Sequence, residues 1–211
     1  MSMATNWEDQ VDGLVGDIET MRKHTIHRKL IAVAGPPASG KTTLAKTLAD
    51  RLNNCSYLSL DGFHLDNSIL IEKGLRNRKG SPETFDVNGF ADLLRRLETK
   101  EEIYVPDFDR DTERTINCAY PIPYHDDLVI VEGNYLLLDE PIWRDLTDYW
   151  NLTVFLELDL RSLKRRLTKR WIAQGFDEQE AEAWIVTNDL PNAHRLLRNR
   201  IPEDITLYVR G

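Results

Sequence analysis

Cysteine is scarce in this chain of 211 residues, which has only Cys55 and Cys118, far apart and without paired spacing. This scarcity argues against a disulfide framework and against a cysteine-based zinc site. Long apolar runs are also absent, because none approaches the ~18 consecutive apolar residues of a membrane-spanning helix. Residues 1–9 lack the basic and then apolar layout of a signal peptide. We therefore expect a cytoplasmic protein that does not act in a membrane.

Positive charge is in deficit as well. The chain has 27 Lys and Arg residues against 35 Asp and Glu residues, which gives a formal net charge of −8 at pH 7. This balance argues against a nucleic-acid partner, because a polyphosphate backbone needs a broad excess of cations. The basic residues concentrate instead at 76–79 and 161–170. Two small basic patches suit a small anionic ligand, so we expect a small-molecule partner.

The most informative motif is a complete G-x-x-x-x-G-K-[ST] phosphate-binding loop, Gly35-Pro36-Pro37-Ala38-Ser39-Gly40-Lys41-Thr42, followed by Thr43. Its glycines let backbone amides turn toward phosphate oxygens, and Lys41 reaches the β- and γ-phosphates. The hydroxyl of Thr42 is placed to ligate Mg²⁺. An apolar run at 30–34 precedes the loop and a helical periodicity at 42–52 follows it. Strand, loop and helix together predict a site for a nucleoside triphosphate.

Alternating apolar runs and helical periodicities predict an α/β fold. Strands are expected at 30–34, 55–60, 128–131, 152–158 and 205–209, and helices at 42–52, 86–97, 160–174, 177–190 and 192–200. This order predicts about five parallel strands covered by helices on both faces. A short strand at 103–106 is expected to stop at Pro106, and the polar residues 107–127 to form a long loop.

Residues 7–27 carry apolar side chains at helical spacing with acidic residues between them. We expect an amphipathic helix that packs on the core before the first strand. Such a helix serves an interface as readily as a core, so a homodimer stays open. The chain then divides into an N-terminal segment, 1–27, and one domain over 28–211.

Acidic residues follow two of the expected strands, at Asp61 and Glu132. Because ligands of an open parallel sheet bind beyond the carboxyl ends of its strands, both should lie on one rim with Thr42. These three residues could hold Mg²⁺, and Asp61 is the candidate base for a hydroxyl that is phosphorylated. The alternatives are an Asx-turn at Asp61, which precedes Gly62, and a simple strand-end cap at Glu132.

The expected helix at 160–171 has one apolar face and several basic residues around the rest. Arg166 and Arg170 are one turn apart, so they can act on the same object. A solvated basic face is the plain interpretation. The functional interpretation is a lid that brings arginine to the charge that develops on a transferred phosphoryl group.

Four segments in this order, 35–43, 59–64, 78–86 and 130–135, resemble the phosphoribulokinase/uridine kinase family of P-loop kinases. The second and third are most similar to pantothenate kinases and to kinase-like proteins of bacterial fructose transport systems. The resemblance implies a P-loop NTPase fold with a helical lid near 160–175. It also implies transfer of the γ-phosphoryl group of ATP to a hydroxyl, with Mg²⁺ at Thr42, Asp61 and Glu132. The implied catalytic residues are Lys41, Asp61, Arg166 and Arg170.

The acceptor is less constrained than the transfer chemistry. The resemblance places five residues near it: His64, Lys79, Arg110, Tyr124 and His125. A helix cap at His64, a surface ion pair at Arg110 and a surface loop at His125 are the plain alternatives. The chain is shorter than a pantothenate kinase, and Phe108 stands where relatives have an aromatic residue with a hydroxyl. A sugar or sugar-like acceptor is our first expectation, with a nucleoside, pantothenate, or a nucleotide-binding regulator linked to a transporter as alternatives.

Overall fold

The structure, a computed structural model, describes residues 6–23, 27–99 and 101–209. Within them, five strands form a parallel sheet in the order β2-β5-β1-β6-β7. Their bounds are Lys29–Ala34 for β1, Cys55–Ser59 for β2, Leu128–Gly133 for β5, Leu152–Glu157 for β6 and Ile205–Tyr208 for β7. The expected parallel sheet is confirmed. Its strands are continuous apolar runs because strands of such a sheet are buried on both faces.

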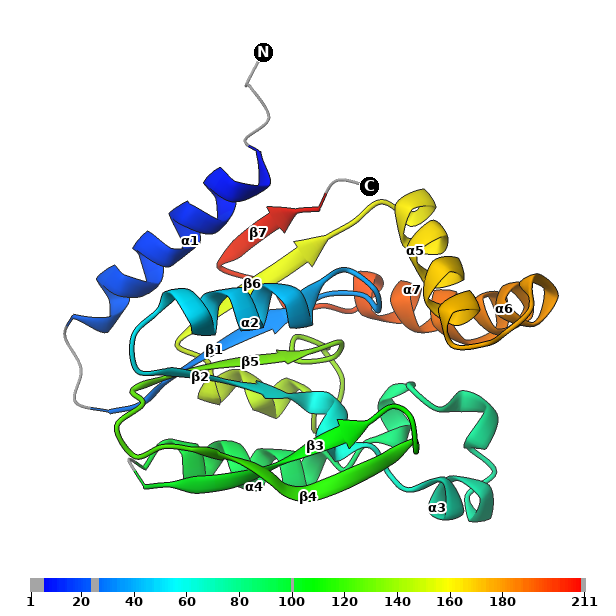
Figure 1. The fold of residues 1–211 in the computed structure, drawn as a ribbon, viewed down its shortest axis with the longest axis horizontal. Helices are drawn as coiled ribbons and strands as arrows, with labels where there is room; N and C mark the ends of the chain where they lie inside the picture. The colour runs from blue at the N-terminus through cyan, green and yellow to red at the C-terminus, as the bar shows by residue number, and fades with distance from the viewer. Residues whose placement is uncertain (1–5, 24–26, 100, 210–211) are drawn as a thin grey trace.

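Helices cover both faces of this sheet (Figure 1). Alternate residues of β1 point to opposite faces, so Ile31 and Val33 join one core while Leu30 and Ala32 join the other. Helices α1 (Trp7–Arg22) and α2 (Lys41–Arg51) pack on the first face, and α4 (Val87–Leu97) and α7 (Leu190–Arg198) contribute to the second. The N-terminal helix therefore packs on the core through buried residues. Residues 24–26 of its expected span lie outside the described residues.

The segment 103–122 forms an antiparallel hairpin of β3 (Ile103–Asp109) and β4 (Arg114–Ile122). Our expectation of a strand that stops at Pro106 and a loop over 107–127 is therefore wrong. The register shifts between Val105 and Asp107, so Pro106 sits at an irregularity where its missing N–H breaks no regular pairing. Most side chains of β4 are exposed, so this strand shows no apolar alternation.

The remaining elements build the rims around the sheet. They are α3 (Asn67–Glu72), α5 (Leu160–Ala173), α6 (Glu178–Trp184) and the short helices η1 (Leu60–Phe63), η2 (Arg76–Arg78), η3 (Pro82–Thr84) and η4 (Arg144–Tyr149). A π-helical turn, η5 (Ile185–Asp189), joins α6 to α7. No helix in the described part of the chain is long and apolar enough to cross a membrane.

Candidate active site

The phosphate loop connects β1 to α2 at the carboxyl ends of the strands (Figure 1). Gly40 precedes α2 with φ at 101°, a left-handed conformation that glycine adopts without strain. The Ser39 hydroxyl is buried and makes no hydrogen bond to any described residue. An unsatisfied buried hydroxyl at a helix N-terminus fits an anion such as phosphate. Pro37, Ala38, Gly40, Lys41, Thr42 and Thr43 line the adjoining pocket, whereas Gly35, Pro36 and Ser39 lie behind them.

Lys41 begins α2, and its ammonium group lies against the loop. Its Nζ donates a hydrogen bond to the carbonyl oxygen of Pro36 at 2.9 Å. Burial lowers the pKa of Lys41 to about 8, although the negative charges of Glu132 and Asp61 oppose this change. A bound phosphate would favour the charged ammonium again. Lys41 is thus a buried cation that an anionic ligand would stabilise.

Glu132 lies near the end of β5, the strand between β2 and β1. Its Oε1 accepts hydrogen bonds from Ser59 Oγ at 2.7 Å and from Thr42 Oγ1 at 3.0 Å. Burial raises the pKa of Glu132, and the charge of Asp61 raises it further, while Lys41 opposes both effects. The carboxyl group is therefore held in place by two hydroxyls and releases its proton less readily than an exposed glutamate.

Asp61 follows β2 in the short helix η1. Its Oδ2 forms an ion pair with Arg110 NH2 at 2.6 Å. Burial alone would raise the pKa of Asp61, but His64, Arg110 and Arg170 outweigh it and hold the pKa below its ordinary value. Asp61 is therefore an ionised carboxylate, whereas the neighbouring Glu132 is shifted toward its neutral form.

The donor set at this rim fits Mg²⁺ only together with a phosphate ligand. Among the described residues, no three His, Cys, Asp or Glu side chains could hold a metal ion by themselves. The Thr42 hydroxyl and the Glu132 carboxylate do converge, and Asp61 lines the same pocket. Mg²⁺ typically takes one or two carboxylates, with waters and substrate phosphates completing its shell. These three residues thus match the ion's preference.

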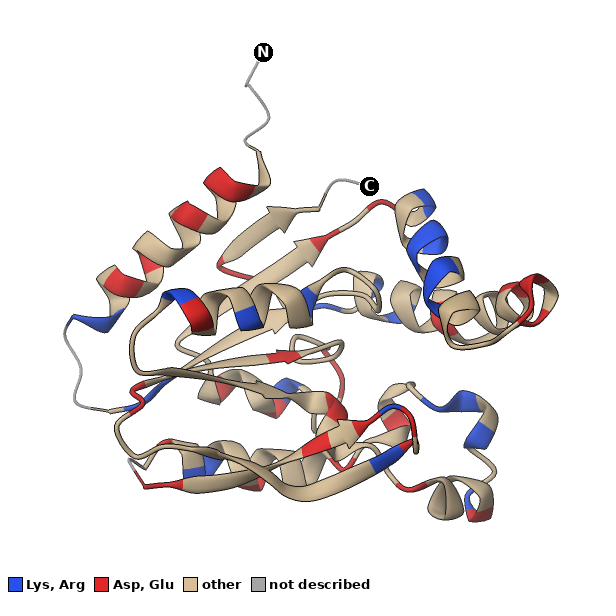
Figure 2. Ribbon diagram, viewed as in Figure 1, with Lys and Arg blue, Asp and Glu red and all other residues tan. Residues whose placement is uncertain are grey.

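Helix α5 presents two arginines to the phosphate loop, among the basic residues that Figure 2 shows along it. Arg166 NH1 donates to the carbonyl oxygens of Ser39 at 3.3 Å and Ala38 at 3.5 Å. Arg170, one turn later, lines the pocket. Burial lowers the pKa of Arg170, and the positive charge of Arg110 adds to this while Asp61 opposes it. Of the two arginines of the expected lid, Arg170 therefore lines the pocket, whereas Arg166 contacts the carbonyl oxygens of the phosphate loop.

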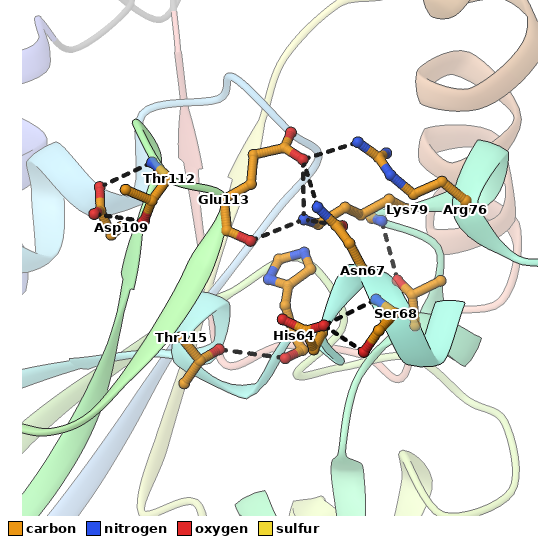
Figure 3. A network of polar contacts seen from close by, with 12 residues as sticks. His64, Asn67, Ser68, Arg76, Lys79, Asp109, Thr112, Glu113 and Thr115 are labelled. Carbon is orange, nitrogen blue, oxygen red and sulfur yellow. Dashed lines mark hydrogen bonds and ion pairs between the residues drawn. The ribbon is translucent and has the colours of Figure 1, made fainter. Parts of the chain in front are cut away.

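A polar network forms the opposite wall (Figure 3). Lys79 Nζ donates to Asn67 Oδ1 at 2.7 Å and to Glu113 Oε2 at 3.4 Å. Glu113 Oε2 also accepts from Arg76 NH2 at 2.9 Å. The Lys79 ammonium lies 5.0 Å from the ring centre of Phe108. Sequence reasoning identified Lys79 but missed Glu113, whose only signal was its place within the polar segment 107–127.

His64 belongs to the same wall. Its Nδ1 lies 2.8 Å from the carbonyl oxygen of Asp61, and its ring centre is 4.1 Å from Phe85 and 4.9 Å from Phe108. Burial lowers the pKa of His64, although Asp61 opposes this change. His64 therefore holds its second proton less readily than an exposed histidine, and its ring contacts the Asp61 turn.

An aromatic wall in the same pocket was not expected. It consists of Trp171, Phe176 and Trp184, with ring centres 4.9 Å and 5.6 Å from Trp171. Asp189 Oδ2 accepts from Trp171 Nε1 at 2.6 Å, and burial raises the pKa of Asp189 to about 6. Asn192 Oδ1 and Trp184 Nε1 are buried and make no hydrogen bond to any described residue. The π-helical turn η5 sets the spacing between Trp184, Asp189 and Asn192. The pattern of a regular helix does not reveal this spacing.

One cavity of about 630 Å³ brings these groups together. Of the residues expected in the site, those lining it are Pro37, Ala38, Gly40, Lys41, Thr42, Thr43, Asp61, His64, Lys79, Arg110, Glu132 and Arg170, whereas Arg166 does not line it. Tyr124 and His125 do not line the cavity and lie just before β5, near the amino-terminal end of that strand. His125 instead approaches Asp126 at 3.5 Å, and Tyr124 is exposed. The structure therefore does not bring these two residues to the acceptor.

Comparisons with known proteins show the family of this chain. A family model described as an AAA domain matches residues 31–184. The "Putative uridine kinase C227.14" of Schizosaccharomyces pombe is 31% identical over 93% of this chain and 89% of its own length. The chain belongs to the phosphoribulokinase/uridine kinase family of P-loop kinases. A domain of this type implies ATP binding.

Three further similarities were found for this P-loop kinase. The crystal structure of a "putative fructose transport system kinase" from Silicibacter sp. TM1040 superimposes with a TM-score of 0.90, at 38% identity, over 93% of this chain and 98% of that one. The "Uncharacterized protein YggC" of Escherichia coli is 34% identical over 87% of this chain and 84% of its own. A pantothenate kinase of Enterococcus faecalis is 29% identical over 70% of this chain, which spans 49% of that enzyme.

Proposed function

We propose that this P-loop kinase transfers the γ-phosphoryl group of ATP to a hydroxyl of a small metabolite, with a sugar or sugar-like compound as the acceptor. One observation carries the proposal. The ionised carboxylate of Asp61 shares a cavity with the phosphate loop, so a hydroxyl beside Asp61 would face the end of a bound triphosphate. A nucleotide-binding switch has no need of such a base, whereas phosphorylation of a hydroxyl does.

The nucleotide side of the cavity would hold the phosphates. Backbone amides of the loop and the ammonium of Lys41 contact them, and Ser39 gains the partner that its buried hydroxyl lacks. Thr42, Glu132 and Asp61 would hold Mg²⁺, which neutralises phosphate charge when it is bound. ATP is thereby fixed with its γ-phosphoryl group toward the cavity.

The acceptor side would supply the proton chemistry. Asp61 orients the acceptor hydroxyl and takes its proton as the oxygen bonds to the γ-phosphorus, and ADP leaves. Arg170 lies in the same cavity and stabilises the charge that spreads over the transferred group. Arg166 contacts the carbonyl oxygens of the loop itself and keeps α5 against it. In this proposal α5 is the lid, and its closure excludes water.

The aromatic wall supports a sugar-like acceptor. Aromatic faces pack against the C–H face of a sugar ring or polyol chain, while its hydroxyls donate hydrogen bonds. Asn192 Oδ1 is a buried acceptor without a donor in the described structure, and Asp189 offers a second acceptor. The relative of known structure named for a fructose transport system is consistent with this class. Nucleosides and pantothenate remain the alternative acceptors.

A panel of acceptors tests the proposal. ADP release is measured with Mg·ATP and this protein in the presence of free sugars, polyols, nucleosides, pantothenate and glycerate. We expect a sugar or polyol to accelerate ADP release strongly over the rate without acceptor. A flat response across the panel, with ATP binding demonstrated, would contradict the proposed activity.

A further inference from the structure

The tip of the β3–β4 hairpin, residues 110–113, is held at both ends across the pocket. Arg110 pairs with Asp61 Oδ2 at 2.6 Å. Glu113 is held on the other wall by Asn67, Arg76 and Lys79, with Asn67 Nδ2 donating at 3.0 Å (Figure 3). The tip therefore connects the carboxylate expected to act as the base with the acceptor-side network.

The middle of β3, in the same hairpin, is fixed against the Asp61 turn. A Cβ on Gly62 would lie only 2.8 Å from the carbonyl oxygen of Pro106, so the two backbones approach as closely as glycine allows. At the tip, by contrast, the contacts to Asp61 are polar. Glu113 has φ at 54°, a strained conformation for a residue with a side chain, and its three polar partners offset that strain.

Exposure shows which partner of the Arg110–Asp61 pair can move. The Arg110 side chain is 49% exposed, whereas that of Asp61 is 25% exposed. Arg110 can therefore swing into water and remain solvated. Asp61 is held by its backbone in η1 and stays in the cavity. An acceptor hydroxyl that enters the cavity thus meets a carboxylate whose Oδ2 is occupied by a displaceable cation.

We propose that Arg110 restrains Asp61 until an acceptor hydroxyl displaces it, so that the hairpin tip makes phosphoryl transfer depend on the acceptor. This inference rests on the proposed kinase activity. While Arg110 is paired, Asp61 is a poor base for a water molecule, and hydrolysis of ATP is slow. When an acceptor replaces Arg110, its oxygen bonds to the γ-phosphorus and the bond to the β,γ-bridging oxygen breaks. The hydroxyl proton passes to Asp61 and then to solvent, and ADP leaves.

The test compares ADP release from Mg·ATP without any acceptor in the wild type, Arg110→Gln, Arg110→Lys and Arg114→Gln. We expect Arg110→Gln to raise this acceptor-free hydrolysis about fivefold or more, because it removes a charge-assisted hydrogen bond from Asp61. Arg110→Lys keeps the charge and should restore most of the restraint. Arg114 is an exposed residue on the same hairpin and serves as the matched control, with hydrolysis unchanged.

Two further measurements separate restraint from other roles. The double variant Arg110→Gln/Asp61→Asn should lose the increase in acceptor-free hydrolysis, because the released Asp61 carboxylate is the group that activates water. Glu113→Gln weakens the contacts of the hairpin tip with Arg76 and Lys79 and should raise acceptor-free hydrolysis by a smaller factor. This variant gives a second test if Arg110→Gln does not fold. A fall in acceptor-free hydrolysis, or no change, in both single variants with ATP binding intact would overturn the inference. The acceptor panel decides the kinase proposal separately, because it is read in the wild type.

Discussion

At the scale of single residues, two neighbouring carboxyl groups have opposite tendencies. Asp61 faces His64, Arg110 and Arg170 and stays ionised, whereas burial favours the neutral form of Glu132. Two carboxyl groups whose surroundings push their pKa values apart are the usual basis for divided roles in catalysis. Asp61, the proposed base, is therefore ionised and free of a proton that it would have to lose first, while the Glu132 carboxyl group is held by the hydroxyls of Ser59 and Thr42.

Asp61→Asn tests the assignment of the base. The amide cannot take a proton, so we expect acceptor-dependent turnover to fall by about 10²- to 10⁴-fold, while ATP affinity changes little. Steady-state kinetics and calorimetric titration with ATP measure the two effects. Asp92→Asn, an exposed change on α4, is the control and should leave both values unchanged. Wild-type turnover in Asp61→Asn would show that the role assigned to Asp61 is wrong.

Lys41 predicts a pH dependence for ATP binding. Burial lowers the pKa of the free protein's Lys41 to about 8, so above that pH the ammonium loses its charge before ATP arrives. ATP binds the charged form, and its apparent affinity at pH 9 should therefore be about tenfold weaker than at pH 7. Titrations of ATP at several pH values measure this slope. Lys41→Met should bind ATP weakly at every pH and lose the slope, and an equal slope in both proteins would contradict the account.

At this scale the sequence predicted the residues of the phosphate loop, Asp61 and Glu132, because each follows an apolar run that predicts a strand. It missed the aromatic wall, because the contact between Trp171 of α5 and Trp184 of α6 is a tertiary one that helical periodicity does not reveal. The family resemblance placed Tyr124 and His125 near the acceptor, but both precede β5 and do not line the cavity.

At the scale of elements, α5 has two faces with different consequences. Arg170 lines the pocket, while the neighbouring Lys169 is exposed on the outer side. We expect Arg170→Gln to lower kcat by about 10²- to 10³-fold, as for loss of one group that stabilises transition-state charge. Lys169→Gln removes the same charge from the same helix and should leave kcat unchanged. Equal effects of the two substitutions would indicate general electrostatics rather than a lid.

The β3–β4 hairpin was the element that the sequence did not predict. Strands of the parallel sheet are apolar runs, but β4 is mostly exposed and Pro106 suggested an end. The hairpin is held in place by tertiary packing, which includes the close approach of Gly62 and Pro106.

Two glycine substitutions test this packing. Gly62→Ala places a Cβ 2.8 Å from the Pro106 carbonyl oxygen, so we expect a loss of about 1–3 kcal/mol in the free energy of unfolding. Gly16→Ala lies in α1 with nothing within 4 Å of the added Cβ and should stabilise by up to about 1 kcal/mol. Thermal unfolding measures both. A Gly62→Ala protein as stable as the wild type would show that the hairpin can shift away from the turn.

At the scale of the whole molecule, the parallel sheet brings the phosphate loop, Asp61 and Glu132 to one rim, where we propose that ATP and the acceptor bind. The sheet order puts β5 between β2 and β1, so the turns that carry Asp61, Glu132 and the loop are adjacent. The hairpin and α5 then approach this rim from two sides, each with an arginine in the cavity. Fold and site together account for a small-molecule kinase, and the acceptor depends on the pocket between these two elements.

The most direct test of phosphoryl transfer follows the γ-phosphorus itself. Phosphorus NMR of Mg·ATP, the protein and the best acceptor of the panel distinguishes a new phosphate ester from inorganic phosphate. The account predicts that a phosphate ester accumulates in step with ADP, and that Asp61→Asn abolishes it. Accumulation of inorganic phosphate alone, with no ester at any acceptor concentration, would contradict it.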